Sequence, residues 1–454
     1  MSTISSGKIQ SNNLKLYYDF LNKRSYSTNL VNYSNWTIGT GSIATSSSLY
    51  GVSGFTENGT SDENIREIGL DPFGNNTILW SARNNDIASD GDGGWNTSTY
   101  PIDNTKMYRF SVWVNREVLG NGSFYFGLYS NDSELNAVYL KSKLTGLTYS
   151  STINPYFTVG SGLSYLGSFN NNWALFVGHL WPMNSATGSN HIDSGCYTRE
   201  LGKISDLTIS SDRGDFIQVE ESAYVRHRSY LYYSTDPTTV QKWCYPRIDL
   251  IDGTEPSIQD LLTSSDPIKD LSRNGITASF EYNSGLTSDK AMIFNGSNKI
   301  ITSFVPNETS ATYEVWCELK EDSNNYNMVF GSTLPYLSFN NNGKILLSNR
   351  YDNLQCNMYS NTDWELNKIY HITYTYDFDG VDTTAKIYIN GVLDNEDIFP
   401  GYYTPTAYNF TLGDGRKTNW YPFNGNLYSI KVYNKVLSSE EVSKNYQIHK
   451  NRFN

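Results

Sequence analysis

Acidic residues beside glycines are the first groups in this chain whose type and spacing could do chemistry. Asp90 and Asp92 lie in the run Asp90-Gly-Asp-Gly-Gly94, and three aspartates lie within Asp377–Asp382. Ca²⁺ takes roughly six to eight oxygen ligands, and flexible acidic loops supply both carboxylates and backbone carbonyls. Neither run is followed by the glutamate that completes an EF-hand. The metal prediction is therefore confined to Asp90 and Asp92, and Asp377–Asp382 is predicted to be a hairpin turn.

Aromatic residues beside amides form a second kind of candidate site, because sugars bind to aromatic platforms flanked by hydrogen-bonding groups. Two such clusters fall in predicted loops: Trp95, Asn96 and Tyr100 in the first half of the chain, and Asn419, Trp420 and Tyr421 near its end. These six residues are the predicted ligand-binding residues. The alternative is that the rings cap the ends of a folded core or contact another protein.

The pattern of potential catalytic residues predicts no enzyme and no catalytic residue. Five histidines are present, and none belongs to an HExxH motif, an HxH motif or a histidine–cysteine cluster. No GxSxG, P-loop or GxGxxG context occurs either. His179, His227 and His371 lie in strand-like runs, where they are predicted to be structural. A glycosidase needs only two carboxylates at the right separation, so cleavage of a glycan stays open as an alternative.

Runs in which apolar and polar side chains alternate predict the strands that must position these residues. In the first part of the chain they are Met107–Val114, Ser123–Tyr129, Asn172–Trp181, Ala223–Tyr233 and Lys242–Leu250. Their length and spacing are typical of a β-sandwich. Near the end, Asn390-Gly391 between two apolar runs predicts a hairpin turn with positive φ at both positions. Ser438 with Glu441 forms a capping box that opens a short helix.

Composition favours an all-β protein of two or three domains. The chain has 454 residues, of which 38% are hydrophobic and 15% aromatic, including 36 Tyr. The apolar residues are largely Tyr, Phe, Ile and Val, which favour strands, and the Asn, Ser, Thr and Gly between them favour turns. The net charge of −12, without a basic stripe, argues against nucleic acid and anionic membranes as partners.

The cysteines and the N-terminus bear on where such a chain would fold. The cysteines are Cys196, Cys244, Cys317 and Cys356, far apart in the sequence. A disulfide between Cys196 and Cys244 is left open, and the other two are predicted to fill the core. The N-terminus shows no apolar signal segment, and no run is long enough to span a bilayer. We therefore expect synthesis in a cytoplasm without a secretion signal, and no membrane insertion.

The C-terminal motifs resemble those of a known family. They are, in order, Lys269-Asp-Leu-Ser-Arg-Asn-Gly275, Ala291–Ile301, Ala311–Leu319, Ile369–Leu393 and Phe410–Val442. This order resembles the laminin-G-like, concanavalin A-like lectin jelly roll. The resemblance implies an antiparallel sandwich but no single function, because this fold carries lectins, enzymes and inert spacers. Glycosidases of the family carry a Glu-x-Asp-x-x-Glu strand, a pattern that this sequence lacks.

The opening segment Leu14–Tyr26 resembles the first strand of the same family in phage proteins, yet its usual successor, Asp270-Leu-Ser, comes far later. We predict that residues 1–29 are the tail and first strand of this sandwich, that residues 30–262 are an inserted sandwich, and that residues 263–454 complete the first, because insertion at a loop tip is tolerated. The inserted block is similar to carbohydrate-binding-module-like jelly rolls of phage appendage proteins, chiefly in Tyr245–Leu262. The alternative is a tail that docks elsewhere.

Together the resemblances imply two antiparallel β-sandwiches in a bacteriophage virion protein, such as a tail fibre, head fibre or other appendage or decoration. The predicted function is adhesion to host-surface glycans. One alternative is a structural fibre, collar or head-decoration subunit without a glycan site, and another is a glycan-cleaving enzyme. The expected partners are other virion proteins, host glycans and further copies of the chain in a dimer or trimer, because weak sugar sites gain avidity by multivalency.

Overall fold

The computed structural model describes residues 11–453 except 23, 27–28, 32, 34–35, 44–53, 119, 149–152, 162–172, 208–212, 266–267, 282–286, 289–290, 297, 323–325, 333–334, 352–353, 402–407 and 415–420. Nearly all of its regular structure is β. The chain divides into two compact units: unit 1 comprises residues 1–26 and 266–454, and unit 2 comprises residues 27–265. Each unit has its own hydrophobic core.

Unit 2 is a β-sandwich built from sixteen described strands and two short helical segments. In chain order the elements are β2 (Gly39–Thr40), β3 (Phe55–Glu57), η1 (Ser61–Glu63), β4 (Asn64–Leu70), β5 (Asn76–Arg83), β6 (Gly91–Thr97), β7 (Tyr100–Pro101), β8 (Met107–Val118), β9 (Ser123–Asn131), β10 (Lys141–Ser142), β11 (Tyr156–Ser161), β12 (Trp173–Trp181), β13 (Gly195–Thr198), β14 (Gly202–Ser205), β15 (Phe216–Ile217), β16 (Tyr224–Tyr232), β17 (Val240–Ile251) and α1 (Ile258–Thr263). The alternating runs of the sequence thus correspond to β8, β9, β12, β16 and β17.

The two sheets of unit 2 enclose an aromatic core. One sheet has the order β10-β15-β12-β8-β17-β5-β4-β2, with β13 and β14 beside β12, and the other has the order β11-β9-β16-β6-β3, with β7 beside β16. Between them Trp36, Trp80, Trp95 and Trp243 are fully buried. Their rings meet at centroid distances of 5.3–5.7 Å, in the tilted and edge-on arrangements that aromatic pairs prefer. This core packs against the inner faces of both sheets and holds them together.

Unit 1 is a second sandwich, formed by both ends of the chain. Its elements are β1 (Leu14–Asp19), β18 (Ala278–Glu281), β19 (Thr287–Ser288), β20 (Ala291–Asn295), β21 (Lys299–Thr302), β22 (Ala311–Leu319), β23 (Tyr326–Gly331), β24 (Tyr336–Asn340), β25 (Lys344–Tyr351), β26 (Leu354–Asp363), β27 (Ile369–Phe378), β28 (Asp382–Ile389), β29 (Val392–Pro400), β30 (Thr411–Leu412), β31 (Asn424–Tyr433) and α2 (Ser439–Phe453). One sheet runs β19-β20-β31-β22-β27-β28-β29 with β1 beside β31, and the other runs β18-β21-β30-β23-β24-β25-β26.

The N-terminal strand lies in the sandwich formed by the C-terminal part of the chain. Strand β1 pairs antiparallel with β31, with Leu16 opposite Val432 and Tyr18 opposite Ile430. The two points at which the chain leaves and re-enters unit 1 are adjacent, because Tyr26 and Ile268 form an antiparallel bridge. The chain therefore begins in unit 1, continues through the whole of unit 2, and returns to unit 1 next to the residues at which it left.

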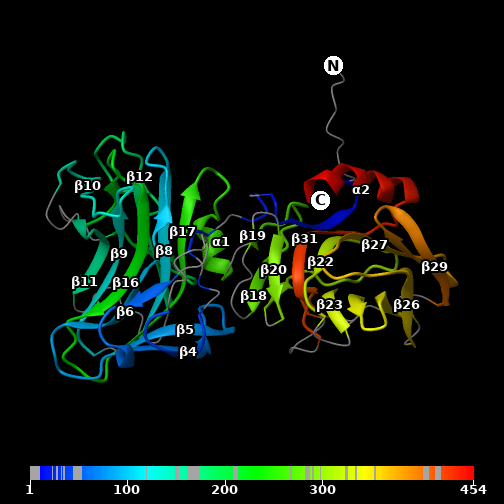
Figure 1. The fold of residues 1–454 in the computed structure, drawn as a ribbon, viewed down its shortest axis with the longest axis horizontal. Coiled ribbons are helices and arrows are strands. Elements are labelled where there is room, and N and C mark those ends of the chain that lie inside the picture. The colour runs from blue at the N-terminus through cyan, green and yellow to red at the C-terminus, as the bar shows by residue number, and fades with distance from the viewer. Residues whose placement is uncertain are drawn as a thin grey trace, which may run out of the picture. The chain divides into compact units, whose positions relative to one another are not determined.

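Local signals in unit 1 appear in the structure as the sequence predicts. Asn390 and Gly391 have φ of 52° and 80° and join β28 to β29, as a type I′ hairpin requires. Ser438 and Glu441 form reciprocal hydrogen bonds at the start of α2. Helix α2 is longer than predicted, at fifteen residues, and covers one face of a sheet (Figure 1), where Trp316 of β22 stacks on the ring of Tyr446.

The structure closes the open question about cysteines in unit 2. Cys196 on β13 and Cys244 on β17 are both buried free thiols, so no disulfide joins them. Burial raises the pKa of the Cys196 thiol to about 12, so it stays protonated. Within the described part of the chain, no helix is long and apolar enough to cross a bilayer.

Candidate functional site

The outer face of the six-stranded sheet in unit 2 carries a row of tyrosine and arginine side chains. Along β16 the side chains alternate between the two faces of the sheet. Val225 and Leu231 point into the core, and the buried His227 stacks on Trp95. The alternate positions, which face away from the core, hold Arg226, Arg228, Tyr230 and Tyr232.

The neighbouring strands extend this row across the sheet. Tyr125 and Tyr129 on β9 lie on the same outer face, since the residues that alternate with them, Phe124, Phe126 and Leu128, fill the core. Tyr156 of β11 joins them by lying against Gly127, where an added Cβ would come within 2.8 Å of its ring. We call the resulting surface the tyrosine face. It comprises Tyr125, Tyr129, Tyr156, Tyr230, Tyr232, Tyr233, Arg226 and Arg228, with Asn58 and Asn96 at its edge.

The tyrosine face is half-exposed and well ordered by its own contacts. Tyr125, Tyr129, Tyr156 and Tyr232 are half-buried, and Tyr233 is 51% exposed. The ring of Tyr125 meets those of Tyr156 and Tyr232 edge-on, at centroid distances of 4.9 and 5.3 Å. The Tyr232 hydroxyl donates to Asn58 Oδ1 at 2.8 Å, and the Tyr230 hydroxyl donates to Asn96 Oδ1. These contacts hold the rings in place before any ligand arrives.

Two arginines lie among these rings without a carboxylate partner in the described residues. The Arg228 guanidinium lies 4.4 Å from the centroid of Tyr156, 5.5 Å from that of Tyr129 and 5.7 Å from that of Tyr230. Arg226 lies 5.9 Å from the Tyr129 ring. Arg228 is only 3% exposed, and its Nε and Nη2 atoms have no hydrogen-bond partner. The buried Nε of Arg226 also lacks one.

The hydroxyls of Tyr125, Tyr156 and Tyr232 are neutral at ordinary pH. Burial raises the pKa of Tyr125, Tyr156 and Tyr232 above the usual value, and for Tyr156 the nearby Arg228 charge opposes the increase. Desolvation penalises the phenolate, so each group keeps its proton and can donate a hydrogen bond. The face therefore presents rings, hydroxyl donors and amides, with positive charge beside them.

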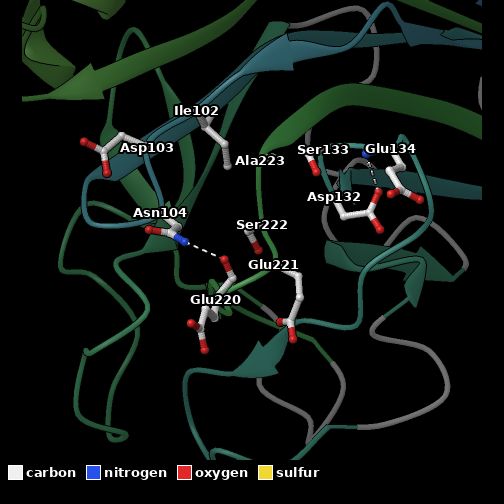
Figure 2. Close-up of a pocket in the computed structure, with 10 residues that line it drawn as sticks. All are labelled: Ile102, Asp103, Asn104, Asp132, Ser133, Glu134, Glu220, Glu221, Ser222 and Ala223. Carbon is white, nitrogen blue, oxygen red and sulfur yellow. Dashed lines mark hydrogen bonds between the residues drawn. The ribbon is translucent and has the colours of Figure 1, made fainter.

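An acidic hollow of about 720 Å³ lies in the same unit, where β7, β9 and β16 meet the loops before and after them (Figure 2). Its lining residues are Ile102, Asp103, Asn104, Asp132, Ser133, Glu134, Glu220, Glu221, Ser222 and Ala223. Two of its five carboxylates cap their own loops. Asp103 accepts from Thr105, and Asp132 accepts from the Glu134 amide and from Asn136, which lowers the pKa of both aspartates. The hollow is thus a negatively charged loop cluster.

The structure corrects two of the predicted sugar-binding residues. Trp95 is fully buried in the core of unit 2, and Tyr100 is 8% exposed on β7, so neither is a surface platform. The glycine-rich run before Trp95 misled the prediction, because it forms strand β6 rather than a loop. An added Cβ at Gly94 would lie 2.1 Å from the Ser229 carbonyl oxygen, so the glycine allows β6 and β16 to approach closely.

The other predicted residues have different outcomes. Asn96 is half-buried at the edge of the tyrosine face, where it accepts the Tyr230 hydrogen bond. Asn419 and Trp420 lie outside the described residues. Tyr421 is half-buried in unit 1, with its ring 4.9 Å from that of Tyr326. Asn96 is thus the one predicted residue that the described structure brings to the tyrosine face.

The predicted calcium residues are in unlike surroundings. Asp90 is exposed, whereas Asp92 is fully buried on β6 and accepts a hydrogen bond from the Ser234 amide at 2.8 Å. Burial raises the pKa of Asp92 to about 7. Among the residues that the structure describes, no three His, Cys, Asp or Glu side chains gather as metal ligands. Calcium at Asp90 and Asp92 stays a prediction. Asp377–Asp382 forms the predicted turn, in which Asp379 accepts from two backbone amides.

One cluster in unit 2 contains a serine, a histidine and an aspartate. His179 Nδ1 lies 2.7 Å from Ser194 Oγ, and that hydroxyl donates to Asp215 Oδ1 at 2.7 Å. All three side chains are about 99% buried. In a nucleophilic triad the histidine lies between serine and aspartate, whereas here the serine does. Its proton already belongs to the Asp215 bond, so this cluster is a hydrogen-bond network that holds β12 to the following loop.

The tyrosine face was missed at the sequence level, although one signal for it was present. The run Tyr224–Tyr233 places an aromatic or arginine side chain at every second position. This alternation predicts a strand, and its outward face is the one that carries the tyrosine and arginine side chains. The partners Tyr125 and Tyr156 come from separate strands, and only the pairing of β16 with β9 and of β9 with β11 brings them together.

A comparison with known protein families gives a match for part of the C-terminal sandwich. Residues 294–443, within unit 1, match the family model described as "Concanavalin A-like lectin/glucanases superfamily". No curated protein has a sequence that matches this chain significantly.

Solved structures with similar parts include the receptor-binding domain of botulinum neurotoxin D, with 17% identity, a TM-score of 0.32 and coverage of 40% of this chain and 49% of that chain. Another is domain 4 of an extracellular GH43 arabinanase from Geobacillus stearothermophilus in complex with arabinotriose, with 17% identity, a TM-score of 0.32 and coverage of 38% and 90%. This chain therefore spans about half of the neurotoxin domain. The family match and the sheet order together identify residues 294–443 as part of a concanavalin A-like lectin/glucanase sandwich.

Proposed function

We propose that this chain is an adhesion protein of a bacteriophage virion, an appendage or decoration that binds glycans on the host surface, and that the tyrosine face of unit 2 is its sugar-binding surface. The carrying observation is the row of half-exposed rings Tyr125, Tyr129, Tyr156 and Tyr232. Aromatic rings offer a large apolar area together with a polar hydroxyl, which suits the mixed surface of a sugar. Asn58 and Asn96 add amide groups at the edge.

Preorganisation supports this use of the face. Rings that are held by mutual contacts and by hydrogen bonds to Asn58 and Asn96 lose little freedom when a ligand binds. The sandwich provides a rigid scaffold, because its inner face is packed on the tryptophan core. Tyr233, which follows β16 directly and has a positive φ of 62°, is the most accessible ring of the face.

The virion part of the proposal rests on the sequence resemblance to phage appendage proteins and on the split sandwich. In that setting we propose other virion proteins as neighbours and a closed cyclic dimer or trimer as the assembly, since most homo-oligomers are cyclic. Several copies on one particle turn weak, shallow sugar sites into useful avidity. Sedimentation of protein released from particles should show the oligomer, and a monomer present as a single copy per particle contradicts it.

An array of bacterial surface polysaccharides tests the glycan-binding proposal directly. The full chain should bind a subset of the glycans, and Tyr129→Ala with Tyr233→Ala should reduce the signal at least tenfold. Tyr359→Ala is the matched control, because Tyr359 is a 37% exposed tyrosine on β26 of unit 1, outside the face. Absence of binding to any glycan favours a purely structural subunit. Shortening of a bound polysaccharide, abolished by changing one carboxylate, favours an enzyme of the lectin/glucanase class.

A further inference from the structure

Arginine side chains give the tyrosine face a feature that a platform for neutral sugars does not need. Arg226 and Arg228 are two residues apart on β16, and both face outward. Their cross-strand neighbours on this face are Tyr129 opposite Arg226, and Gly127 and Asn96 opposite Arg228. None of these is acidic. Residues two positions apart in a strand have Cα atoms about 7 Å apart, so the like charges of Arg226 and Arg228 repel each other.

The burial of Arg228 increases the cost of leaving this charge unpaired. Its side chain is 3% exposed, and two of its nitrogens have no hydrogen-bond partner. The rings of Tyr129, Tyr156 and Tyr230 compensate in part, through cation–π attraction. By comparison, the buried Arg109 and Arg247 both bind Asp249 at 2.8 Å, and the buried Arg66 donates to the Thr37 carbonyl oxygen. The described surroundings of Arg226 and Arg228 contain no such carboxylate.

We infer that the tyrosine face selects acidic glycans, whose carboxylate, sulfate or phosphate group pairs with Arg226 while Arg228 adds a second positive charge behind it. This inference rests on the proposed function. Arg226 is half-exposed, so an anionic group can reach its guanidinium from solvent, and a guanidinium binds such oxyanions in a two-point geometry. The sugar ring carrying that group stacks on Tyr129, the ring that both arginines flank.

The acidic hollow sets the direction of the ligand. It begins beyond Asn131 and at Ala223, a few residues along the strands from Arg226, and its carboxylates repel an anionic chain. An acidic polysaccharide is therefore expected to run from Arg226 toward Tyr232 and Tyr233, away from the hollow. Neutral sugar units bind at that end through the rings and amides alone.

The test uses the full chain and pairs of polysaccharides that differ only in charge: each acidic polysaccharide of the array beside its carboxyl-reduced, desulfated or dephosphorylated form. We expect binding to the acidic member to exceed that to the neutral member at least tenfold and to weaken as salt rises. Arg226→Gln should remove most of this preference, and Arg226→Lys should retain part of it. Arg83→Gln is the matched control, because Arg83 is a half-exposed arginine of unit 2 paired with Glu67 on the other sheet.

Three results distinguish the inference from the proposal on which it rests. Equal binding of both members of each pair, unchanged by Arg226→Gln but lost with Tyr129→Ala, overturns the acidic selectivity and leaves the glycan-binding face intact. Preference for acidic glycans that survives Arg226→Gln overturns the assignment to this arginine. Binding to no glycan overturns both. Arg228→Gln is a second test variant, used once circular dichroism shows that the chain is folded. We expect it to reduce the preference for acidic glycans further.

Discussion

The guanidinium of Arg228 lies 4.4 Å from the centroid of the Tyr156 ring, and Tyr156 reaches it by lying against Gly127. Gly127 is opposite Arg228 on the paired strands. A side chain at position 127 would meet the Pro155 carbonyl oxygen at 2.3 Å and push the ring of Tyr156 away. One glycine thus allows a ring from β11 to cover the backbone of β9 and to stack on a cation of β16.

We predict that Tyr156→Ala destabilises unit 2 by about 2–4 kcal/mol, because it removes a large half-buried ring and the cation–π partner of Arg228. Tyr156→Phe keeps the ring and should cost less than about 1 kcal/mol. Gly127→Ala should resemble Tyr156→Ala, since its Cβ displaces the ring. Urea unfolding of the three variants measures this. Equal stability of Tyr156→Ala and Tyr156→Phe would show that the stacking contributes nothing.

A buried ion pair under helix α2 leads to a prediction for unit 1. Lys431 Nζ lies 2.6 Å from Glu314 Oε1, and both side chains are at most 1% exposed. Lys431→Met leaves the Glu314 charge buried without its cation, which should cost about 3–5 kcal/mol. The double variant Glu314→Gln with Lys431→Met should recover most of that loss. Additive losses in this double-mutant cycle would contradict the coupling.

Buried histidines predict that the protein loses stability in mild acid. Burial lowers the pKa of His449 to about 3, with the Lys431 charge adding to the effect. The unfolded chain binds this proton below about pH 6.5, and the folded protein does not do so until about pH 3. The free energy of unfolding therefore falls as pH falls from 6.5 toward 3. Glu314, whose pKa is also lowered, adds a loss below its ordinary value of 4.5.

The variant His449→Gln isolates this contribution. It cannot take up the proton, so the decrease in melting temperature between pH 7 and pH 4.5 should be smaller than in the wild type. His227→Gln in unit 2 should act in the same direction, since burial lowers the pKa of His227 to about 3 as well. Identical pH profiles for the wild type and both variants would contradict the assignment.

The adjacent crossing points predict that unit 2 can be removed. Ser25 and Lys269 exchange hydrogen bonds, with the Lys269 amide donating to the Ser25 carbonyl oxygen at 2.7 Å and the Ser25 hydroxyl donating to the Lys269 carbonyl oxygen at 3.0 Å. A short Gly-Ser linker in place of residues 27–265 should therefore close unit 1 without strain. We expect this shortened chain to fold cooperatively with a β-type circular dichroism spectrum. A shortened chain without a cooperative unfolding transition would show that the two units fold only together.

Several features of the fold could be predicted from local sequence because their causes are local. The Asn390-Gly391 turn follows from backbone sterics, the start of α2 follows from one capping box, and β8, β9, β12, β16 and β17 follow from the two-residue alternation. The match of Leu14–Tyr26 to a first strand anticipated the pairing of β1 with β31, although the paired residues Leu16 and Val432 are far apart in the chain.

The candidate site could be predicted only in part. The glycines of Gly91–Gly94 predict a loop, and a loop would expose Trp95. The actual role of Gly94 is to let the backbone of Ser229 approach, which only the pairing of β6 with β16 reveals. The tyrosine face depends on three strands brought together by long-range pairing. No local pattern reports that Tyr125, Tyr156 and Arg228 share one surface, and composition shows only that tyrosine is abundant.

Footprinting of the full chain by carbene labelling and mass spectrometry, with and without a bound acidic polysaccharide, tests the central claim most directly. We expect protection of peptides that carry Tyr129, Tyr156, Arg226 and Tyr233, with no change at the control Tyr359, which is 37% exposed in unit 1. Protection confined to unit 1, or to the acidic hollow at Glu220 and Glu221, would contradict the assignment of the tyrosine face as the glycan-binding surface.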